Sequence, residues 1–259
     1  MNETFTSVAD TQRIEPGDEA RHLATAMYDR LLVELRELTP EEWEMETVCA
    51  PWTVADIVRH LVGAAKGHAS MRQFARQAIY GARRKSEHHG NDMDAMNALQ
   101  VADHADLTPT HLIEALEEVA PRAVAKRMSR PRFTHRIRLP NAPSGSTAVG
   151  MPPSLTLGHL FTVILTRDVF LHRIDISRAT GRVLEVDPDT EGRLVADVVG
   201  EWAQRHGAAF RLTLTGPAGG RFASGHGGPA VELDALEFCW ILSGRGPAPQ
   251  DLLDTRVLF

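Results

Sequence analysis

Three ionisable residues share a spacing in the chain that suits a divalent metal ion. Asp168 and His172 are four residues apart and Asp175 follows three residues later, so on a helix all three project from nearly the same face. A carboxylate and an imidazole one helical turn apart can bind a single cation. The residues between them are mostly apolar, which indicates that this face is drawn into a helical bundle. Because buried charge is costly unless it is paired or binds something, packing alone does not explain the pattern.

A metal site inside a bundle also needs a ligand from a facing helix. His60 is the best-placed partner, since it lies among apolar residues in the middle of another predicted helix. Together, His60, Asp168 and His172 predict a site with two imidazoles and one carboxylate, which leaves a position on zinc or a similar cation open to water or substrate. In the alternative interpretation, both histidines only form hydrogen bonds at the edge of the core, and Asp168 pairs with Arg167 or Arg173.

Hydrophobic periodicity and capping residues predict the helices that position these side chains. Four main helices are expected: residues 18–38, residues 53 to 74 or 79, residues 109 onward with a kink or an early end at Pro121, and residues 151–181. Residues 1–15 read as a loose arm, 93–101 as a short additional helix, and 130–150 as a long irregular connection. This pattern predicts a four-helix bundle over residues 1–181.

The pattern changes after Gly181. Residues 193–206 are predicted to be helical, and the alternation in residues 210–215 is typical of a strand that ends in a turn. Residues 221–224 and 230–233 predict two further strands, and 236–242 a short helix. The predicted fold class is therefore α+β, with the helical bundle followed by a small α/β domain over residues 182–259.

The amino-acid composition of the chain excludes some classes of binding partner and location. A net charge of −6 argues against binding to nucleic acid or to an anionic membrane surface. No apolar run approaches the ~20 residues that span a bilayer, and the N-terminal residues lack the apolar core of a signal peptide. Cys49 and Cys239 lie far apart, have no metal or redox spacing and are expected to be small buried residues, so we expect a cytoplasmic protein. The pattern does not indicate an oligomeric state.

Two of these segments resemble a known family. Residues 51–63 look like the first metal-ligand helix of the DinB-like proteins related to mycothiol-dependent maleylpyruvate isomerase, and residues 167–181 look like the second ligand segment. Residues 236–246, a short helix that ends in a Gly-Arg pair, resemble the C-terminal domain of the same family. The resemblance implies a DinB-like four-helix bundle that holds a divalent metal, commonly zinc, through the residues at positions His60, Asp168 and His172.

The resemblance also implies an activity. In the isomerase the metal binds the thiol of mycothiol, and a zinc-bound thiol loses its proton near neutral pH and becomes a nucleophile. The implied function is cis–trans isomerisation of a small unsaturated acid, or S-transfer of the thiol to another electrophile. Arg245, with Arg221 as the second choice, is expected to hold the acidic substrate, because a guanidinium offers a planar fork to a carboxylate. An arginine beside two glycines is otherwise an ordinary surface-loop residue.

Asp168 is also the residue that weakens the resemblance, because the isomerase has Glu at this position. Its shorter arm changes the reach to a metal, the choice of metal, or the need for a bridging water. A second hypothesis is therefore a non-enzymatic protein that binds a metal or a small molecule on the same scaffold. Asp175 is expected to orient His172, to act as an alternative ligand, or to pair with Arg173 or Arg178.

Overall fold

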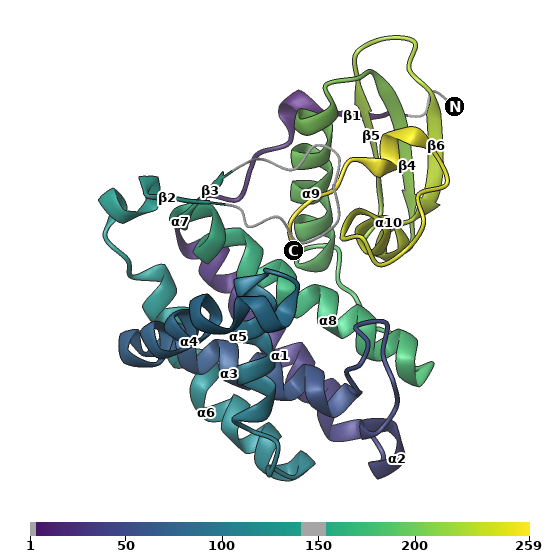
Figure 1. Ribbon diagram of the computed structural model, residues 1–259. Helices are drawn as coiled ribbons and strands as arrows, with labels where there is room; N and C mark the ends of the chain where they lie inside the picture. Colours follow the sequence, from purple (N-terminus) through teal and green to yellow (C-terminus); the bar gives the residue numbers. More distant parts are fainter. Residues whose placement is uncertain (1–3, 141–153) are drawn as a thin grey trace. The chain divides into compact units, whose positions relative to one another are not determined.

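The chain divides into a helical unit and a unit built on a sheet. The computed structural model describes residues 4–140 and 154–259. The helical unit contains residues 16–140 and 154–182, and the sheet unit contains residues 4–15 and 183–259 (Figure 1). The predicted α+β fold class is confirmed.

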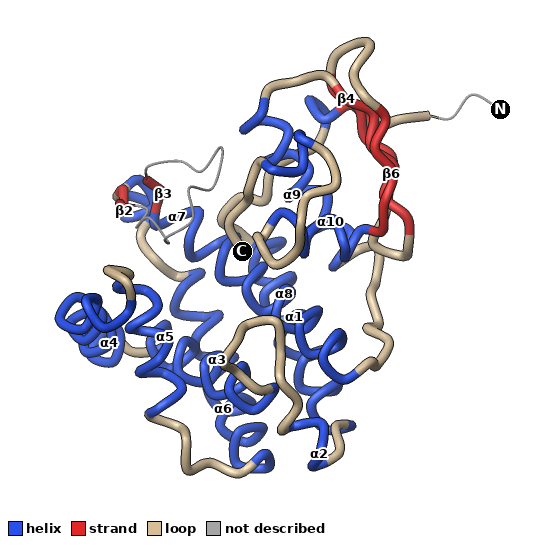
Figure 2. Tube along the Cα trace, turned by 45° about the vertical axis from the view of Figure 1, so that its right-hand side comes forward, coloured by secondary structure: helices blue, strands red, loops and turns tan. Residues whose placement is uncertain are grey.

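Four helices form the bundle of the helical unit. They are α1 (Asp18–Glu37), α3 (Val54–Ala69), α6 (Pro109–Met128) and α8 (Leu165–Thr180). Helix α1 contacts α6 and α8, and α3 contacts the same two helices, so the four close into a ring around one core (Figure 2). Apolar side chains at three- and four-residue steps, such as Ala20, Leu23 and Met27 on α1, are buried there.

The start and the end of α3 are both set by local hydrogen bonds. After the short helix α2 (Pro40–Trp43), Thr53 and Asp56 form a capping box that begins α3 two turns before His60. The helix expected to reach residue 74 or 79 ends at Ala69, because extended Ser70 caps it and also caps α4 (Met71–Arg84). The 3-10 turn η2 (Lys85–His88) leads into α5 (Asp92–Ala102), which packs on both α3 and α4. Residues 93–101 are therefore helical, as predicted.

Two other predictions about helices differ in part from the structure. Helix α6 runs through Pro121 to Met128, and Pro121 is exposed, so the proline neither ends nor shortens it. The helix expected from residue 151 begins at Leu157; residues 151–153 lie outside the described part. Before it come η3 (Arg132–Arg136) and the paired strands β2 (Arg138–Pro140) and β3 (Ser154–Thr156). Helix α7 (Leu157–His159) and the π-helical turn η4 (Leu160–Ile164) then lead directly into α8.

The sheet unit has four strands in the order β1-β5-β4-β6. They are β1 (Thr6–Ser7), β4 (Phe210–Thr215), β5 (Gly220–Ser224) and β6 (Ala230–Asp234). Strand β4 pairs antiparallel with β5 and parallel with β6. Helices α9 (Glu191–His206) and α10 (Ala235–Leu242) cover one face, and η5 (Asp251–Asp254) packs on α10. No described helix combines the length and apolarity needed to cross a membrane.

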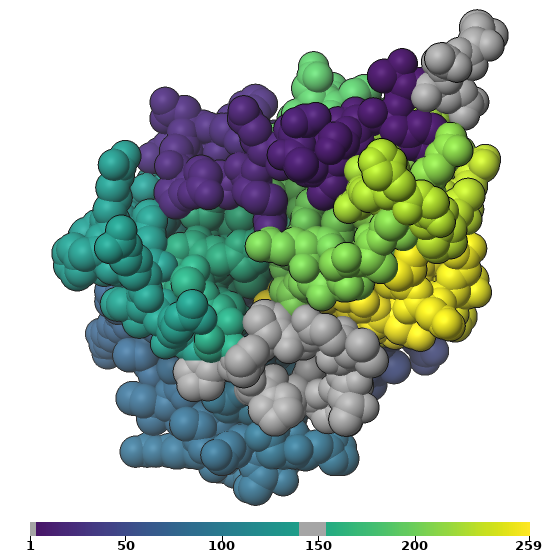
Figure 3. Space-filling model, turned by 90° about the horizontal axis from the view of Figure 1, so that it is seen from above, coloured from purple at the N-terminus to yellow at the C-terminus, as the bar shows by residue number. Residues whose placement is uncertain are grey.

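The N-terminal segment is not the loose arm that the sequence predicts. Its strand β1 pairs in parallel with β5, and η1 (Val8–Asp10) contacts α9 and β5. Arg13 donates from Nε to the buried Asp197 carboxylate at 2.7 Å and from Nη2 to Glu201 at 3.1 Å. Figure 3 shows this segment, in dark purple, lying along the green and yellow-green residues of the sheet unit.

A partly buried ion pair ties the helix that carries Asp168 and His172 to α1. Arg173 on α8 is 0% exposed, and its Nε donates to both carboxylate oxygens of Glu34 at 3.0 Å. Its Nη2 donates to Oε1 of the same carboxylate at 2.6 Å. Arg173 is therefore an anchor of α8, and its neighbour His172 depends on that anchor for its position.

We expect replacement of Glu34 by alanine to destabilise the protein by about 3 kcal/mol, because it leaves the Arg173 charge buried without its carboxylate. The free energy of unfolding from chemical denaturation measures this. Glu37→Ala, on the same helix with a side chain that is 67% exposed, is the control and should change stability by no more than about 0.5 kcal/mol. Equal small effects of the two variants would contradict the anchoring role of Arg173.

Candidate metal centre

The three predicted ligands come together in the helical unit. His60 on α3 and His172 on α8 are 6% and 4% exposed, and Asp168 lies one turn before His172. One donor atom from each residue lies within 4.8 Å of the others. We call this group of three residues the candidate metal centre. The proximity of His60 to the α8 pair is thus observed, and the role of the three residues as ligands stays a prediction.

The separations between the donor atoms fit a shared cation better than hydrogen bonds. His60 Nε2 lies 3.7 Å from Asp168 Oδ2, and His172 Nε2 lies 3.5 Å from Asp168 Oδ1. Both distances exceed the usual range of hydrogen bonds. Ligand atoms about 2.0–2.1 Å from a tetrahedral zinc ion lie roughly 3.3 Å from one another. The Asp168 side chain is 26% exposed, so the carboxylate marks the accessible side of the centre.

A chain of buried amides fixes the proton of His60. Gln77 Nε2 donates to the Gly63 carbonyl at 2.9 Å, which turns its Oε1 toward Gln100 Nε2 at 3.1 Å. Gln100 Oε1 therefore faces His60 Nδ1 at 2.8 Å. Since a carbonyl only accepts, each amide in the chain has one possible orientation and His60 must donate from Nδ1. The lone pair of a neutral imidazole is then on Nε2, the atom that faces Asp168.

Two glycines make this amide chain possible. A Cβ atom on Gly63 would lie 2.6 Å from the Cβ atom of Gln100, and one on Gly67 would lie 2.5 Å from Gln77 Oε1. Both separations are shorter than any normal contact, so a larger residue would displace the glutamines. The glycines on α3 therefore allow α4 and α5 to approach closely enough for their side chains to reach His60.

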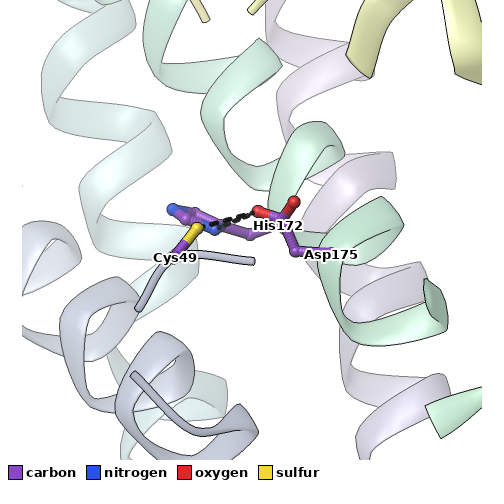
Figure 4. A group of neighbouring side chains, drawn as sticks. All are labelled: Cys49, His172 and Asp175. Atoms are coloured by element: carbon purple, nitrogen blue, oxygen red, sulfur yellow. Dashed lines mark hydrogen bonds and ion pairs between the residues drawn. The ribbon is translucent and has the colours of Figure 1, made fainter. Parts of the chain in front are cut away.

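A carboxylate fixes the proton of His172 in the same way. Asp175, 1% exposed, accepts from His172 Nδ1 at 3.0 Å and from the Cys49 thiol at 3.4 Å. Figure 4 shows His172 and Asp175 side by side on α8, with Cys49 reaching them from the loop before α3. Of the three roles expected for Asp175, the hydrogen-bond distance favours the orientation of His172. This arrangement again leaves Nε2 of His172 to face Asp168.

Cys49 differs from the expectation of a small buried residue, whereas Cys239 is fully buried. Cys49 is half-buried, and its sulfur belongs to a second group of possible ligands with His172 and Asp175. The two groups compete for one imidazole, because Nδ1 of His172 cannot both donate to Asp175 and bind a metal. The hydrogen-bonded form is the one that the structure records.

The predicted substrate arginine belongs to the other unit. Arg245 follows α10, is half-buried, and its backbone N–H donates to the Trp240 carbonyl at 3.2 Å. Arg221, the second choice, is exposed on β5. The three residues of the candidate metal centre all belong to the helical unit. The role of Arg245 in binding an acidic substrate stays a prediction.

Comparisons with known proteins agree with this fold. A family model described as the mycothiol maleylpyruvate isomerase N-terminal domain matches residues 24–177. The crystal structure of the mycothiol-dependent maleylpyruvate isomerase is similar to the chain with a TM-score of 0.55 at 15% identity, over 93% of this chain and 92% of that one. A mutant of that enzyme, with one histidine replaced by alanine, gives a TM-score of 0.54 at the same identity and coverage. No curated protein matches the sequence. At 15% identity the structural likeness shows the shared fold.

The amide chain gives a test that leaves every predicted ligand in place. Gln100→Leu removes the acceptor of the His60 Nδ1 proton, so the imidazole is free to turn or to change tautomer. We expect the affinity for Zn²⁺ to fall by about 10- to 100-fold, as measured by competition with a chromophoric chelator.

Two further variants complete this test. Gln100→Glu keeps an oxygen acceptor toward His60 and should recover most of the affinity. Gln204→Leu, at an exposed glutamine on α9, is the control and should bind as the wild type does. Unchanged Zn²⁺ affinity in Gln100→Leu would contradict the orienting role of the amide chain.

Proposed function

Because the chain belongs to the family of the mycothiol maleylpyruvate isomerase N-terminal domain, we propose that it is a metal-dependent, thiol-using enzyme. Its proposed activity is cis–trans isomerisation of a small unsaturated acid, or S-transfer of a low-molecular-weight thiol to an electrophile. Mycothiol is the proposed thiol, since the family model and the similar crystal structures carry its name. The proposed metal ligands are His60, Asp168 and His172.

The observation that carries this proposal is the orientation of the two imidazoles. Both direct Nε2 toward Asp168, and their Nδ1 atoms are occupied by Gln100 and Asp175. Two neutral imidazoles and one carboxylate form a donor set that suits zinc and related cations, and three protein ligands leave a further position for an exogenous ligand. A cation held there lowers the pKa of a coordinated thiol, which supplies a thiolate near neutral pH.

The chain's own residues have distinct tasks in the proposed reaction. Gln100 and Asp175 keep the Nδ1 protons of the histidines and so hold both Nε2 lone pairs in place. Asp168, the most exposed of the three ligands, faces the side from which a thiol and a substrate arrive. Isomerisation then needs only reversible addition of the thiolate to a conjugated carbon, rotation about the bond that has become single, and elimination of the same thiolate. The substrate gains and loses no atom over these three steps.

Arg245 is the proposed contact for the acid group of the substrate from the sheet unit. A guanidinium binds a carboxylate through two parallel hydrogen bonds, which would orient an unsaturated acid. The second candidate function is a non-enzymatic protein that binds a metal or a small molecule. Asp168 favours it, because its carboxylate arm is one methylene shorter than that of a glutamate.

The metal can be tested without any knowledge of the substrate. We expect about one divalent cation per chain, lost in His60→Ala and in His172→Ala, as measured by elemental analysis of the purified protein. His226→Ala, at an exposed histidine of the sheet unit, is the matched control and should retain the metal. Wild-type protein that is metal-free as purified, and takes up no cation on reconstitution, would refute the proposal.

Turnover distinguishes the enzyme from the binding protein. With mycothiol and a panel of cis-unsaturated acids and electrophiles, we expect thiol-dependent conversion that falls by at least about 100-fold on chelation and returns with Zn²⁺. Asp168→Glu should retain the metal and the conversion. Stabilisation of the wild type by metal in a thermal-shift assay, with no conversion of any member of the panel, would instead support the non-enzymatic function.

A further inference from the structure

A second group of polar side chains lies near the candidate metal centre, around the C-terminal end of α6. Arg127 on α6 is 2% exposed, and its Nη2 donates to the Thr166 hydroxyl at 3.1 Å. Its Nε and Nη1 are buried and have no hydrogen-bond partner among the residues that the structure describes. Because a guanidinium keeps its proton at physiological pH, Arg127 is a desolvated positive charge with unused donors on two of its three nitrogens.

Arg130 and His68, two other side chains of this region, both contact the ring of Phe161. Each of the two also has a buried polar atom without a hydrogen-bond partner in the described part of the chain. Cζ of Arg130 lies 3.9 Å from the ring centroid of Phe161, and the His68 ring stands nearly perpendicular to Phe161 at 6.2 Å between centroids. Arg130 Nε and His68 Nδ1 are buried and unpartnered within the described part of the chain. Phe161 belongs to the π-helical turn η4, and such turns often occur at functional sites.

Helix packing brings these residues together, because α6 contacts both α3, which carries His68, and η4, which carries Phe161. Burial lowers the pKa of His68 to about 3, with a contribution from the charge of Arg127, which Asp168 opposes. His68 is therefore neutral at pH 7. Burial also lowers the pKa of the Arg127 guanidinium, and Tyr28 and Asp168 oppose that effect. Asp168, a member of the candidate metal centre, is thus also the carboxylate that partly compensates the charge of Arg127.

We propose that Arg127, Arg130 and His68 form a binding site for the carboxylate group of a small-molecule ligand. We call these three residues the carboxylate site. A carboxylate accepts hydrogen bonds from the unused N–H groups of Arg127 and Arg130 and from the N–H of a neutral His68, and it compensates the buried charge. This inference deepens the proposed function and rests on it for the cation beside the site. It adds, in the helical unit, a second carboxylate contact to the one proposed for Arg245.

The melting temperature of a variant distinguishes an arginine that binds a ligand from one that holds the fold together. A buried cation that holds the fold together is expensive to replace, whereas one with unmet donors can be exchanged for an apolar side chain at little cost or with a gain. We therefore expect Arg127→Met to have a melting temperature equal to or above that of the wild type. Arg122→Met is the control, because Arg122 is an exposed residue of the same helix and pairs with Glu118.

Maleate, a cis-unsaturated dicarboxylate, is the probe for the carboxylate site. In a buffer free of phosphate and other carboxylates, calorimetry should show that the metal-loaded wild type binds maleate. Arg127→Met should weaken this binding by about 10- to 100-fold, as expected for the loss of charge-assisted hydrogen bonds. Arg122→Met should bind maleate as the wild type does. Dimethyl maleate, which has the same carbon frame without charge, should not bind.

Each result of this experiment decides for or against the carboxylate site. Equal maleate affinity in the wild type and Arg127→Met, or phosphate binding as tight as maleate binding, would overturn it. If Arg127→Met does not fold, Arg130→Met decides: a loss of about tenfold supports the site and no loss overturns it. A wild type that takes up no metal refutes the proposed function, yet Arg127-dependent binding of maleate remains measurable in that protein. The two failures are therefore distinguishable.

Discussion

Two hydrogen bonds, each donated by Nδ1 of a buried histidine, determine what this bundle can bind. With both protons on Nδ1, the lone pairs of His60 and His172 point at the oxygens of Asp168 from 3.7 and 3.5 Å. Acceptors that face acceptors at such distances repel one another. A cation bound by all three residues, as proposed, would convert the same geometry into three favourable bonds. The hydrogen bonds to Nδ1 of the two imidazoles therefore matter as much for the proposed metal site as its three proposed ligands.

The two histidines are oriented by different chemistry. A neutral chain of amides, anchored at the Gly63 carbonyl, holds His60, whereas the Asp175 carboxylate holds His172. The amide chain in turn requires the close approach of α4 and α5 to α3 that glycine permits. The ion pair of Arg173 with Glu34 supports the other side by holding α8 against α1.

The sequence predicts the bundle well because apolar periodicity and caps such as Thr53 are local signals. The grouping of Asp168 with His172 follows from helical spacing, and the addition of His60 relies on the family resemblance as well. Gln100 escapes prediction, since its contact with His60 depends on how α5 packs on α3. A polar cap at Ser70 separates two helices that periodicity alone joins. The two-residue strand β1 pairs only through its backbone, which leaves no pattern in the side chains.

A charge balance connects the candidate metal centre with the carboxylate site. In the proposed site, a divalent cation bound by neutral histidines would offset the charges of Asp168 and Asp175. The positive charges of Arg127 and Arg130 would then remain without a compensating charge from the ligands. A thiolate and a carboxylate together supply two negative charges, so the two proposed ligands would neutralise the positive charges of Arg127 and Arg130. As the thiolate adds to a conjugated acid, negative charge moves onto the acid end of the molecule. Arg127, which is already buried near that end, would stabilise this charge more strongly than water does, because its position needs no reorganisation.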